Sequence, residues 1–182
     1  MAETVIETER LRLRDWREED RGPFAAMNAD PNVMQFFPST LSREQSDALM
    51  DRIGSYLERR GFGLFAVERR ADDAFLGFTG FSTPPADTPV VGEVEIGWRL
   101  ASDHWRQGFA YEAASACVEW FWRETSHSRL VSFTAEVNEP SWRLMRKLGF
   151  EHRPDLDFDH PAVARGNLLR AHVVYVMERP DK

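Results

Sequence analysis

The sequence has a single cysteine, no excess of basic residues and no long apolar run. One cysteine among 182 residues cannot form a disulfide within the chain. No apolar stretch approaches the roughly 18 residues that a membrane-spanning helix needs. The formal net charge of -7 argues against general affinity for nucleic acid or for an anionic membrane surface. We therefore expect neither nucleic acid nor a membrane among its partners.

Length and composition predict one compact unit. With 42% hydrophobic residues, a chain of 182 residues can bury one good core and is short for two. We expect a single domain over residues 1–182. The first residues, MAETVIETERLRLRDW, carry charges where a signal peptide needs an apolar segment. The sequence thus predicts a cytoplasmic protein, and it does not distinguish a monomer from a homodimer.

The spacing of apolar residues alternates between strand and helix periods. Leucines that alternate with arginines predict a first strand at residues 10–16. Two helices are predicted next, at residues 18–28 and 42–60, and the second begins with the S-x-x-Q pattern of a capping box. Further strands are predicted at residues 61–70, 74–81, 90–100, 129–137 and 171–179, with helices from residue 108 and over residues 138–150.

This order of elements predicts an α/β fold with a mixed central β-sheet of about six to seven strands flanked by helices. The three strands between residues 61 and 100 are close enough along the chain for antiparallel pairing, whereas the later strands need helical crossovers. Short junctions from a strand to a helix are common places for ligands.

One such junction is HWRQGFAYEAASACVEWFW, residues 104–122, in which a glycine precedes a long helical pattern. The first turn of a helix leaves backbone N–H groups unpaired and carries the positive end of the helix dipole, so residues 106–110 form a candidate anion site. Gly108 would let a phosphate approach the backbone closely. The chain has no G-x-x-x-x-G-K-[ST] motif and no G-x-G-x-x-G after an N-terminal strand, which excludes two familiar phosphate loops.

The junction resembles the acetyl-CoA-binding motif [QR]-x-x-G-x-[GA] of the GNAT N-acetyltransferase superfamily, through the sequence W-R-Q-G-F-A. Its flanks, EIGWRLASDH and YEAASA, are also similar. The ribosomal-protein N-terminal acetyltransferase-like branch of that superfamily has similar segments in the same order as ETERLRLRDW, DPNVMQFFP, N-x-x-S-x-x-x-M-x-K-L-G-F, DFDHP and RAHVVYVMER. The resemblance covers nearly the whole chain and implies the GNAT acyl-CoA N-acyltransferase fold, with acetyl-CoA as donor and a primary amine as acceptor.

The resemblance also implies which residues hold the cofactor. Leu100 matches the strand-end residue whose backbone holds the acetyl and pantetheine groups, and Asn138 matches the asparagine that contacts the cofactor arm. Ser141 follows three residues later on the same helix. The pyrophosphate would bind the turn made of Arg106, Gln107, Gly108, Phe109 and Ala110.

Two positions depart from the family pattern. Trp105 stands where the motif has glutamine or arginine, so phosphate binding would depend on backbone amides and on Arg106. Met145 stands seven residues after Asn138, where many members have a tyrosine general acid. The leaving thiolate would then be protonated by Ser141 or by water, or would need no donor, because a thiol has a reference pKa of about 8.5.

An amine that attacks a thioester directly needs positioning, removal of a proton and stabilisation of the oxyanion, but no metal and no covalent cysteine. Glu93 and Glu95 lie two apart on the strand predicted at residues 90–100, hence on one face. Glu95 matches the glutamate of the branch's E-I-G segment and is our candidate base, acting through water with a pKa raised by a partly dry cleft. A solvated strand residue is an equal alternative for Glu95, and Glu136 is another candidate base.

Cys117 and the histidines do not indicate chemistry of their own. Cys117 falls within the apolar pattern of a predicted helix, which is typical of a small buried side chain rather than a nucleophile. The five histidines form no H-E-x-x-H motif, so we expect no metal site.

The sequence predicts the amine acceptor less specifically than the donor, acetyl-CoA. By family analogy, Phe36 and Phe37 would line the amine site, and the loop that carries Asp155, Asp157 and Asp159 could attract an ammonium group, although a solvated acidic loop is the favoured interpretation. The resemblance favours a protein N-terminal α-amine as acceptor. Alternatives are a small-molecule amine, a donor with a longer acyl chain, and a non-catalytic sensor that binds acyl-CoA.

Overall fold

The computed structural model describes residues 3–180. Three short 3-10 helices lie at Glu18–Asp20, Ser102–His104 and Pro154–Leu156. The other elements, in chain order, are β1 (Thr4–Glu7), β2 (Leu11–Arg14), α1 (Arg21–Ala29), α2 (Arg43–Arg60), β3 (Leu64–Arg69), β4 (Phe75–Ser82), β5 (Glu95–Leu100), α3 (Phe109–Glu124), β6 (Arg129–Ala135), α4 (Glu139–Leu148), β7 (Glu151–His152), β8 (Phe158–Asp159) and β9 (Ala171–Glu178).

The nine strands of the described residues form one sheet in the order β1-β2-β3-β4-β5-β6-β9-β7, with β8 paired to β9. Strands β1 to β5 pair antiparallel, β5 and β6 are parallel, and β9 is antiparallel to β6. This mixed sheet confirms the predicted α/β class. The sheet has more strands than the six to seven predicted, because β7 and β8 span only two residues each and produce no periodic pattern. Strand β1 was not predicted either.

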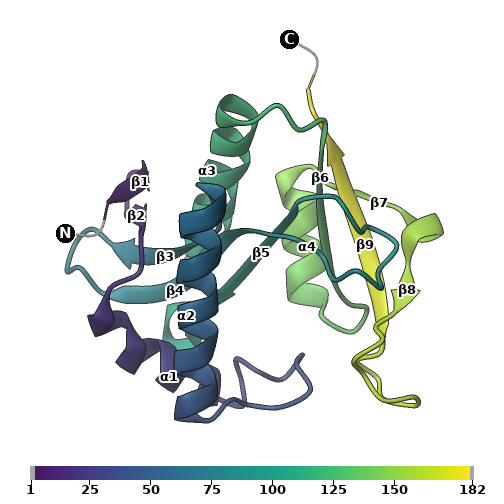
Figure 1. The fold of residues 1–182 in the computed structure, drawn as a ribbon, viewed down its shortest axis with the longest axis horizontal. Coiled ribbons are helices and arrows are strands. Elements are labelled where there is room, and N and C mark those ends of the chain that lie inside the picture. The colour runs from purple at the N-terminus through teal and green to yellow at the C-terminus, as the bar shows by residue number, and fades with distance from the viewer. Residues whose placement is uncertain (1–2, 181–182) are drawn as a thin grey trace.

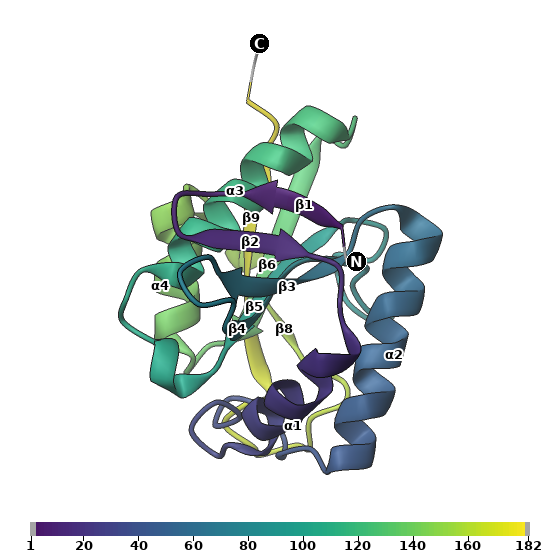
Figure 2. The ribbon, with the colours of Figure 1, turned by 90° about the vertical axis from the view of Figure 1, so that its left-hand side faces the viewer.

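Helices cover both faces of the sheet (Figures 1 and 2). The apolar stripe of α3, including Ala113 and Phe121, packs with side chains of β3, β4 and β5 in the largest core cluster. On the opposite face, Phe24 of α1 and Met50 of α2 pack against Phe78 of β4 in a second cluster. None of the helices within residues 3–180 is both long enough and apolar enough to cross a membrane.

The predicted helix starts are largely confirmed. Ser42 caps α2 as expected: its Oγ accepts from the Gln45 N–H at 3.2 Å, and its own N–H donates to Gln45 Oε1 at 2.8 Å. The helix predicted at residues 18–28 begins with a 3-10 turn and becomes α-helical only at Arg21.

The strand predicted at residues 90–100 is too long, because β5 begins only at Glu95. The Val91 N–H donates to Thr88 O at 3.3 Å and the Glu93 N–H donates to Val90 O at 3.2 Å, so the chain makes successive turns here. Gly92 has φ of 90°, which breaks the extended conformation. Glu93 therefore does not share a strand face with Glu95, and it pairs instead with Arg129 at 3.4 Å.

A buried ionic network joins β2, β3 and the start of α1. Arg14 is 2% exposed and donates to Asp20 at 2.8 and 2.9 Å and to Glu68 at 2.7 Å. Arg12 and Arg17 add further contacts to Glu68 at 3.0 and 2.9 Å. Because both carboxylates are almost completely buried, each depends on the guanidinium groups for compensation of its charge.

Candidate active site

The two halves of the sheet diverge between β5 and β6 (Figure 1), and a cleft opens beside this divergence. Strands β5 and β6 share a single register pair, Glu95 with Val131. Beyond this pair, the side-chain hydroxyl of Ser132 on β6 donates a hydrogen bond to Ile96 O on β5 at 2.9 Å. The resulting cleft has a volume of about 960 Å³ and lies between the C-terminal end of β5 and the first turns of α3 and α4. Such divergence exposes backbone groups that would otherwise pair within the sheet.

Every second backbone N–H group along β5 points toward the β6 side, where the cleft lies. Val94 O accepts from the Val131 N–H at 2.9 Å, so the backbone groups of Val94 point toward β6. Since these directions alternate along a strand, the N–H groups of Trp98 and Leu100 also point to the β6 side, where the partner strand has moved away. Both residues line the cleft. The contact between the Leu100 backbone and the cofactor, which the family resemblance implies, stays a prediction.

The Gly108 turn forms one wall of the cleft. Gly108 has φ of 84° and is the N-cap of α3, and Arg106 also adopts a left-handed conformation with φ of 59°. The first N–H groups of α3 therefore have no partner within the helix and are available to an anion at its positive end. Arg106, Gly108, Phe109 and Ala110 line the cleft, and their predicted contact with a pyrophosphate stays a prediction.

Gln107 differs from its four neighbours, because it is absent from the residues that line the cleft. Its side-chain amide donates to Asp103 O at 3.0 Å, and its own carbonyl accepts from Arg10 Nη1 at 3.0 Å. The hydrogen bonds of Gln107 thus stabilise the turn, and its side chain does not line the cleft.

Arg10 is a feature of this turn that sequence reasoning missed. Its guanidinium lies 4.5 Å from the centre of the Phe109 ring and forms an ion pair with Glu112 at 2.6 Å. A Cβ atom built on Gly108 would lie 3.3 Å from Arg10 Nη2. The cation therefore lies against the Gly108 turn, although about a hundred residues separate the two segments. No local pattern could have indicated this approach, because it depends on the packing of β2 against α3.

Trp105 replaces the polar residue of the family motif with a structural contact. Its indole N–H donates to Leu100 O at 2.8 Å, which ties the end of β5 to the turn before α3. The contact occupies the Leu100 carbonyl and leaves the Leu100 N–H facing the cleft. Trp105 therefore positions the strand end and the turn relative to each other.

The opposite wall is formed by α4. Asn138 occupies the N-cap position, but its side chain does not cap the helix: Nδ2 donates to Thr134 Oγ1 at 2.8 Å instead. Asn is a preferred residue at this position, but the Asn138 side chain here links α4 to β6 instead of capping the helix. Asn138, Ser141 and Met145 all line the cleft. Met145 is 1% exposed, so the position of the family's tyrosine belongs here to the apolar core.

Glu95 is the ionisable group at the base of the cleft. Its carboxylate is half-buried and accepts a hydrogen bond from Ser82 Oγ at 3.1 Å. Burial raises the pKa of Glu95 to about 7, and the Ser82 hydrogen bond lowers it by a smaller amount. A carboxyl group with this pKa exchanges protons near neutral pH, which suits a general base.

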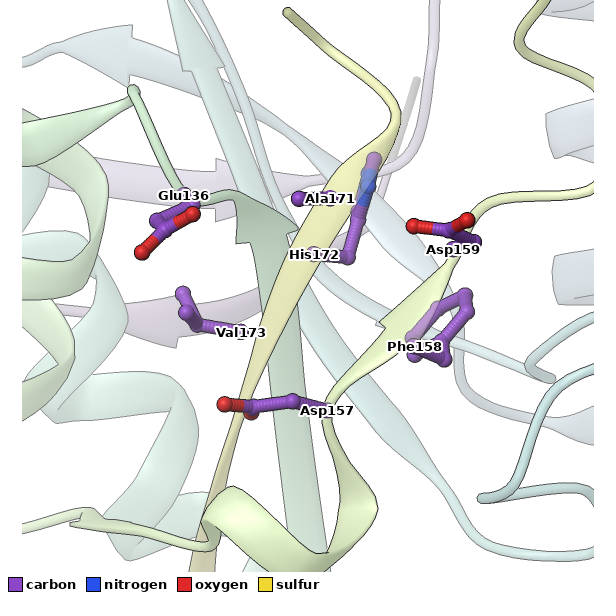
Figure 3. A pocket seen from close by; sticks show the side chains of 7 residues that line it. All are labelled: Glu136, Asp157, Phe158, Asp159, Ala171, His172 and Val173. Atoms are coloured by element: carbon purple, nitrogen blue, oxygen red, sulfur yellow. The ribbon is translucent and has the colours of Figure 1, made fainter. Parts of the chain in front are cut away.

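Glu136, the other candidate base, lies outside this cleft. Strand β6 ends at Ala135, so Glu136 is an exposed residue of the following turn rather than part of the strand. It lines a separate cavity of about 300 Å³ beside β8 and β9. Figure 3 shows the carboxylates of Glu136 and Asp159 on either side of β9. The structure therefore does not bring Glu136 to the Gly108 turn.

The three aspartates of the loop after α4 lie beside basic side chains and do not line the cleft. Asp155 pairs with Arg153 at 2.8 Å and Asp159 with Arg170 at 3.0 Å, and Asp157 lies 3.0 Å from His152 Nε2. The negative charges of Asp155 and Asp159 are thus compensated in part by these two arginines. This arrangement agrees with the interpretation of a solvated acidic loop rather than an ammonium site.

Phe36 and Phe37 line the cleft on the side of α1 and α2, and with them lies Arg99, which sequence reasoning missed. The Arg99 guanidinium lies 4.2 Å from the centre of the Phe37 ring, and Nη1 donates to Asn28 Oδ1 at 2.6 Å. The predicted aromatic wall therefore carries a positive charge. The alternation of side chains along residues 95–100 could have placed Arg99 on the face of Glu95, two positions beyond Gly97.

The described residues offer neither a reactive thiol nor a metal site. Cys117 is completely buried within α3, and burial raises the pKa of its thiol. Within residues 3–180, no cluster of three or more His, Cys, Asp or Glu side chains could hold a metal ion. The groups that line the cleft include the Glu95 carboxylate and basic side chains such as Arg99 and Arg106.

Comparison with known proteins agrees with this geometry. Residues 10–151 match the family model for the acetyltransferase (GNAT) domain. The chain is 30% identical over 150 residues to the uncharacterized N-acetyltransferase YoaA of Bacillus subtilis, covering 81% of this chain and 82% of YoaA.

Solved structures are similar in fold over nearly the whole chain. An acetyltransferase of the GNAT family from Bacillus anthracis has a TM-score of 0.79 at 22% identity, covering 98% of this chain and 99% of that one. RimL, a ribosomal alpha-N-protein acetyltransferase, in complex with coenzyme A has a TM-score of 0.76 at 16% identity, with coverage of 97% and 98%. Spermidine N-acetyltransferase from Vibrio cholerae, in complex with coenzyme A and spermine, has a TM-score of 0.73 at 15% identity, with coverage of 94% and 97%. The family match, together with the diverging sheet and the Gly108 turn, shows that this chain belongs to the GNAT family of N-acetyltransferases.

Proposed function

We propose that the protein transfers the acetyl group of acetyl-CoA to a primary amine by direct attack within a ternary complex. The amine nitrogen attacks the thioester carbonyl carbon, the new C–N bond forms, and the C–S bond breaks as the sulfur leaves as a thiolate. Backbone N–H groups of the Gly108 turn bind the pyrophosphate, and those at the end of β5 hold the thioester arm. No acyl-enzyme forms, which is consistent with the buried position of Cys117.

Glu95 is the proposed base. The acceptor arrives as an ammonium ion at neutral pH, so one proton must leave before the nitrogen can attack. With a pKa raised to about 7, Glu95 takes this proton through an intervening water. The leaving thiolate receives a proton from water or from Ser141, whose side chain shares the cleft.

The observation that carries this proposal is that the Gly108 turn and Glu95 open onto the same cleft. The turn supplies the anion site that a CoA pyrophosphate needs, and Glu95 supplies proton transfer on the side of Phe36 and Phe37. Binding and chemistry can therefore occur within one continuous space.

We propose a protein N-terminal α-amine as the acceptor. Similarity in fold to the ribosomal alpha-N-protein acetyltransferase RimL supports this choice. A small-molecule amine is the second candidate, because the spermidine N-acetyltransferase is similar to a comparable degree. Parallel acetylation assays with short peptides and with small amines distinguish the two.

The test of the reaction replaces Glu95 by glutamine, with Glu93→Gln as the matched control. Glu93 lies two residues away, outside the cleft, and pairs with Arg129. We expect Glu95→Gln to lower kcat by about 10²- to 10⁴-fold while leaving the Kd for acetyl-CoA unchanged, and we expect Glu93→Gln to keep both values. Full kcat in the Glu95→Gln variant would exclude the proposed base. A wild-type protein that binds acetyl-CoA but acetylates no amine would instead be a sensor.

A further inference from the structure

Arg99 is a half-buried cation that forms no ion pair with any acidic residue between positions 3 and 180. Burial lowers its pKa to about 10 without any opposing contribution from a carboxylate, so it stays protonated at neutral pH. Its Nε–H is buried, and no atom of the described residues accepts a hydrogen bond from it. Many other arginines of this acidic protein form ion pairs, for example Arg14, Arg21 and Arg129. A partly buried charge without a carboxylate partner is costly, which points to an anion supplied from outside the chain.

The position of Arg99 is fixed by its neighbours. Asn28 is completely buried, donates to Ser46 Oγ at 2.9 Å and accepts from Arg99 Nη1 at 2.6 Å. The guanidinium also makes cation–π contacts with two aromatic side chains, with its central carbon 4.2 Å from the centre of the Phe37 ring and 5.3 Å from that of Phe78. Arg99 is thus oriented before any ligand binds, which lowers the entropic cost of binding one.

A hollow separates Arg99 from Glu95 on the same face of β5. Cross-strand pairs form it: Ser82 lies opposite Glu95, Gly80 opposite Gly97, and Phe78 opposite Arg99. A Cβ atom built on Gly97 would meet no other atom within 4 Å, so the space above it is open. The proposed base and the unpaired cation therefore stand at the two ends of one hollow whose floor is glycine.

We infer that the acceptor is zwitterionic, with a carboxylate that binds Arg99 while its amine is deprotonated at Glu95. The inference rests on the proposed function, since it concerns the amine acceptor of that reaction. The planar guanidinium suits a carboxylate, to which it can donate two parallel hydrogen bonds. The same charge repels a polycationic acceptor, which has no group to offer it.

The spacing of the two groups limits the acceptor further. Four residues along a strand separate the Cα atoms of Glu95 and Arg99 by about 13 Å. The side chains and one bridging water shorten the gap, yet the acceptor must still place its amine and carboxylate several bonds apart. Either an ω-amino acid or a peptide N-terminus with an acidic second residue has this chemistry.

The experiment compares acids with their uncharged amides in the wild-type protein. One arm uses ω-amino acids from glycine to 6-aminohexanoate, each beside its carboxamide. The second arm uses short C-terminally amidated peptides with aspartate or asparagine as the second residue. Release of CoA gives kcat and KM, and titration with acetyl-CoA is measured separately. We expect the acids to exceed their amides in kcat/KM by about 10- to 100-fold, mainly through KM.

Three variants then test whether Arg99 causes the preference. Arg99→Gln should remove it, so that an acid and its amide react equally slowly, while Arg59→Gln on the exposed surface of α2 should keep it. Gly97→Val fills the hollow from a position with ordinary backbone geometry. It should lower kcat/KM for acids and amides alike without changing the affinity for acetyl-CoA.

The outcomes separate this inference from the proposed function. Amides or plain amines that react as well as the acids would overturn the zwitterionic acceptor and leave the acetyltransferase intact. A preference for acids that persists in Arg99→Gln would overturn the assignment to Arg99. Absence of turnover with every amine tested would overturn the proposed function and this inference together. The arm with the larger kcat/KM identifies the acceptor as a small molecule or a polypeptide.

Discussion

The ionisation of Glu95 predicts an acid limb in the pH dependence of acetyl transfer. With a pKa of about 7, the carboxylate fraction is about 0.1 at pH 6 and about 0.9 at pH 8, so kcat/KM should rise roughly tenfold over this interval. A carboxyl group at its ordinary value of 4.5 would already be about 97% ionised at pH 6 and would give almost no limb. The magnitude of the rise thus reports the desolvation of Glu95.

The assay is initial-rate CoA release between pH 5 and 9 with one acceptor for all proteins. The acceptor amine also titrates, so the informative quantity is the difference between variants. Glu95→Gln should lose the limb that belongs to the carboxylate, whereas Glu93→Gln should keep it. Ser82→Ala removes a hydrogen bond that lowers the pKa of Glu95 and should move the limb to higher pH.

Two results would refute this reasoning. An identical profile for wild type and Glu95→Gln would mean that another group accepts the proton. A limb with its midpoint below pH 5 would mean that water reaches Glu95 freely and that the cleft does not desolvate it.

Three further predictions concern cofactor binding and stability. Gly108→Asp should raise the Kd for acetyl-CoA by more than about 100-fold, because the new side chain adds bulk and negative charge at the proposed phosphate site. The control Gly92→Asp, at a similar φ of 90° outside the cleft, should leave the Kd unchanged. Equal affinities of the wild type and Gly108→Asp in calorimetry would contradict the phosphate site. Glu95→Gln should stabilise the fold at pH 8 but not at pH 4. The pKa of Glu95 is higher in the folded than in the unfolded protein, so the free energy of unfolding of the wild type falls as the pH rises from 4.5 through about 7. The loss is at most about 3 kcal/mol. Thermal unfolding of both proteins at pH 4 and pH 8 tests this. Arg14→Ala should lower the free energy of unfolding by about 3–5 kcal/mol, because it removes the ion pair of the buried Asp20 and one of the three arginine contacts of the buried Glu68; an unchanged midpoint of urea denaturation would contradict the argument.

Local patterns were sufficient for most of the fold. Ser42 and Gln45 predicted the start of α2 because a capping box involves residues only three apart. The long strand predicted at residues 90–100 failed because the apolar alternation continues through Gly92, whereas the backbone turns there. The two-residue strands β7 and β8 exist only because β9 offers them partners, which no local pattern reveals.

Some residues of the candidate site could be predicted from contiguous sequence, whereas others could be found only in the structure. The Gly108 turn is contiguous in sequence, so its glycine and the following helical pattern indicated an anion site directly. Glu95 was predicted as a base from family resemblance, but the raised pKa that would make it effective comes from burial by other segments. Arg10 and Arg99 were missed, because their importance depends on contacts with Phe109 and with Asn28.

The sequence by itself determined the α/β class, the Gly108 turn and the family, since each depends on periodicity or on contiguous residues. Only the tertiary structure decided which charges face the cleft. Glu93 lies outside the cleft because the chain turns before β5 begins, and Glu136 lies outside it because β6 ends at Ala135. Arg99 lines the cleft, where contacts with distant segments hold it. The physical reason is that charge compensation and desolvation depend on distance in space, and residues far apart in the chain set both.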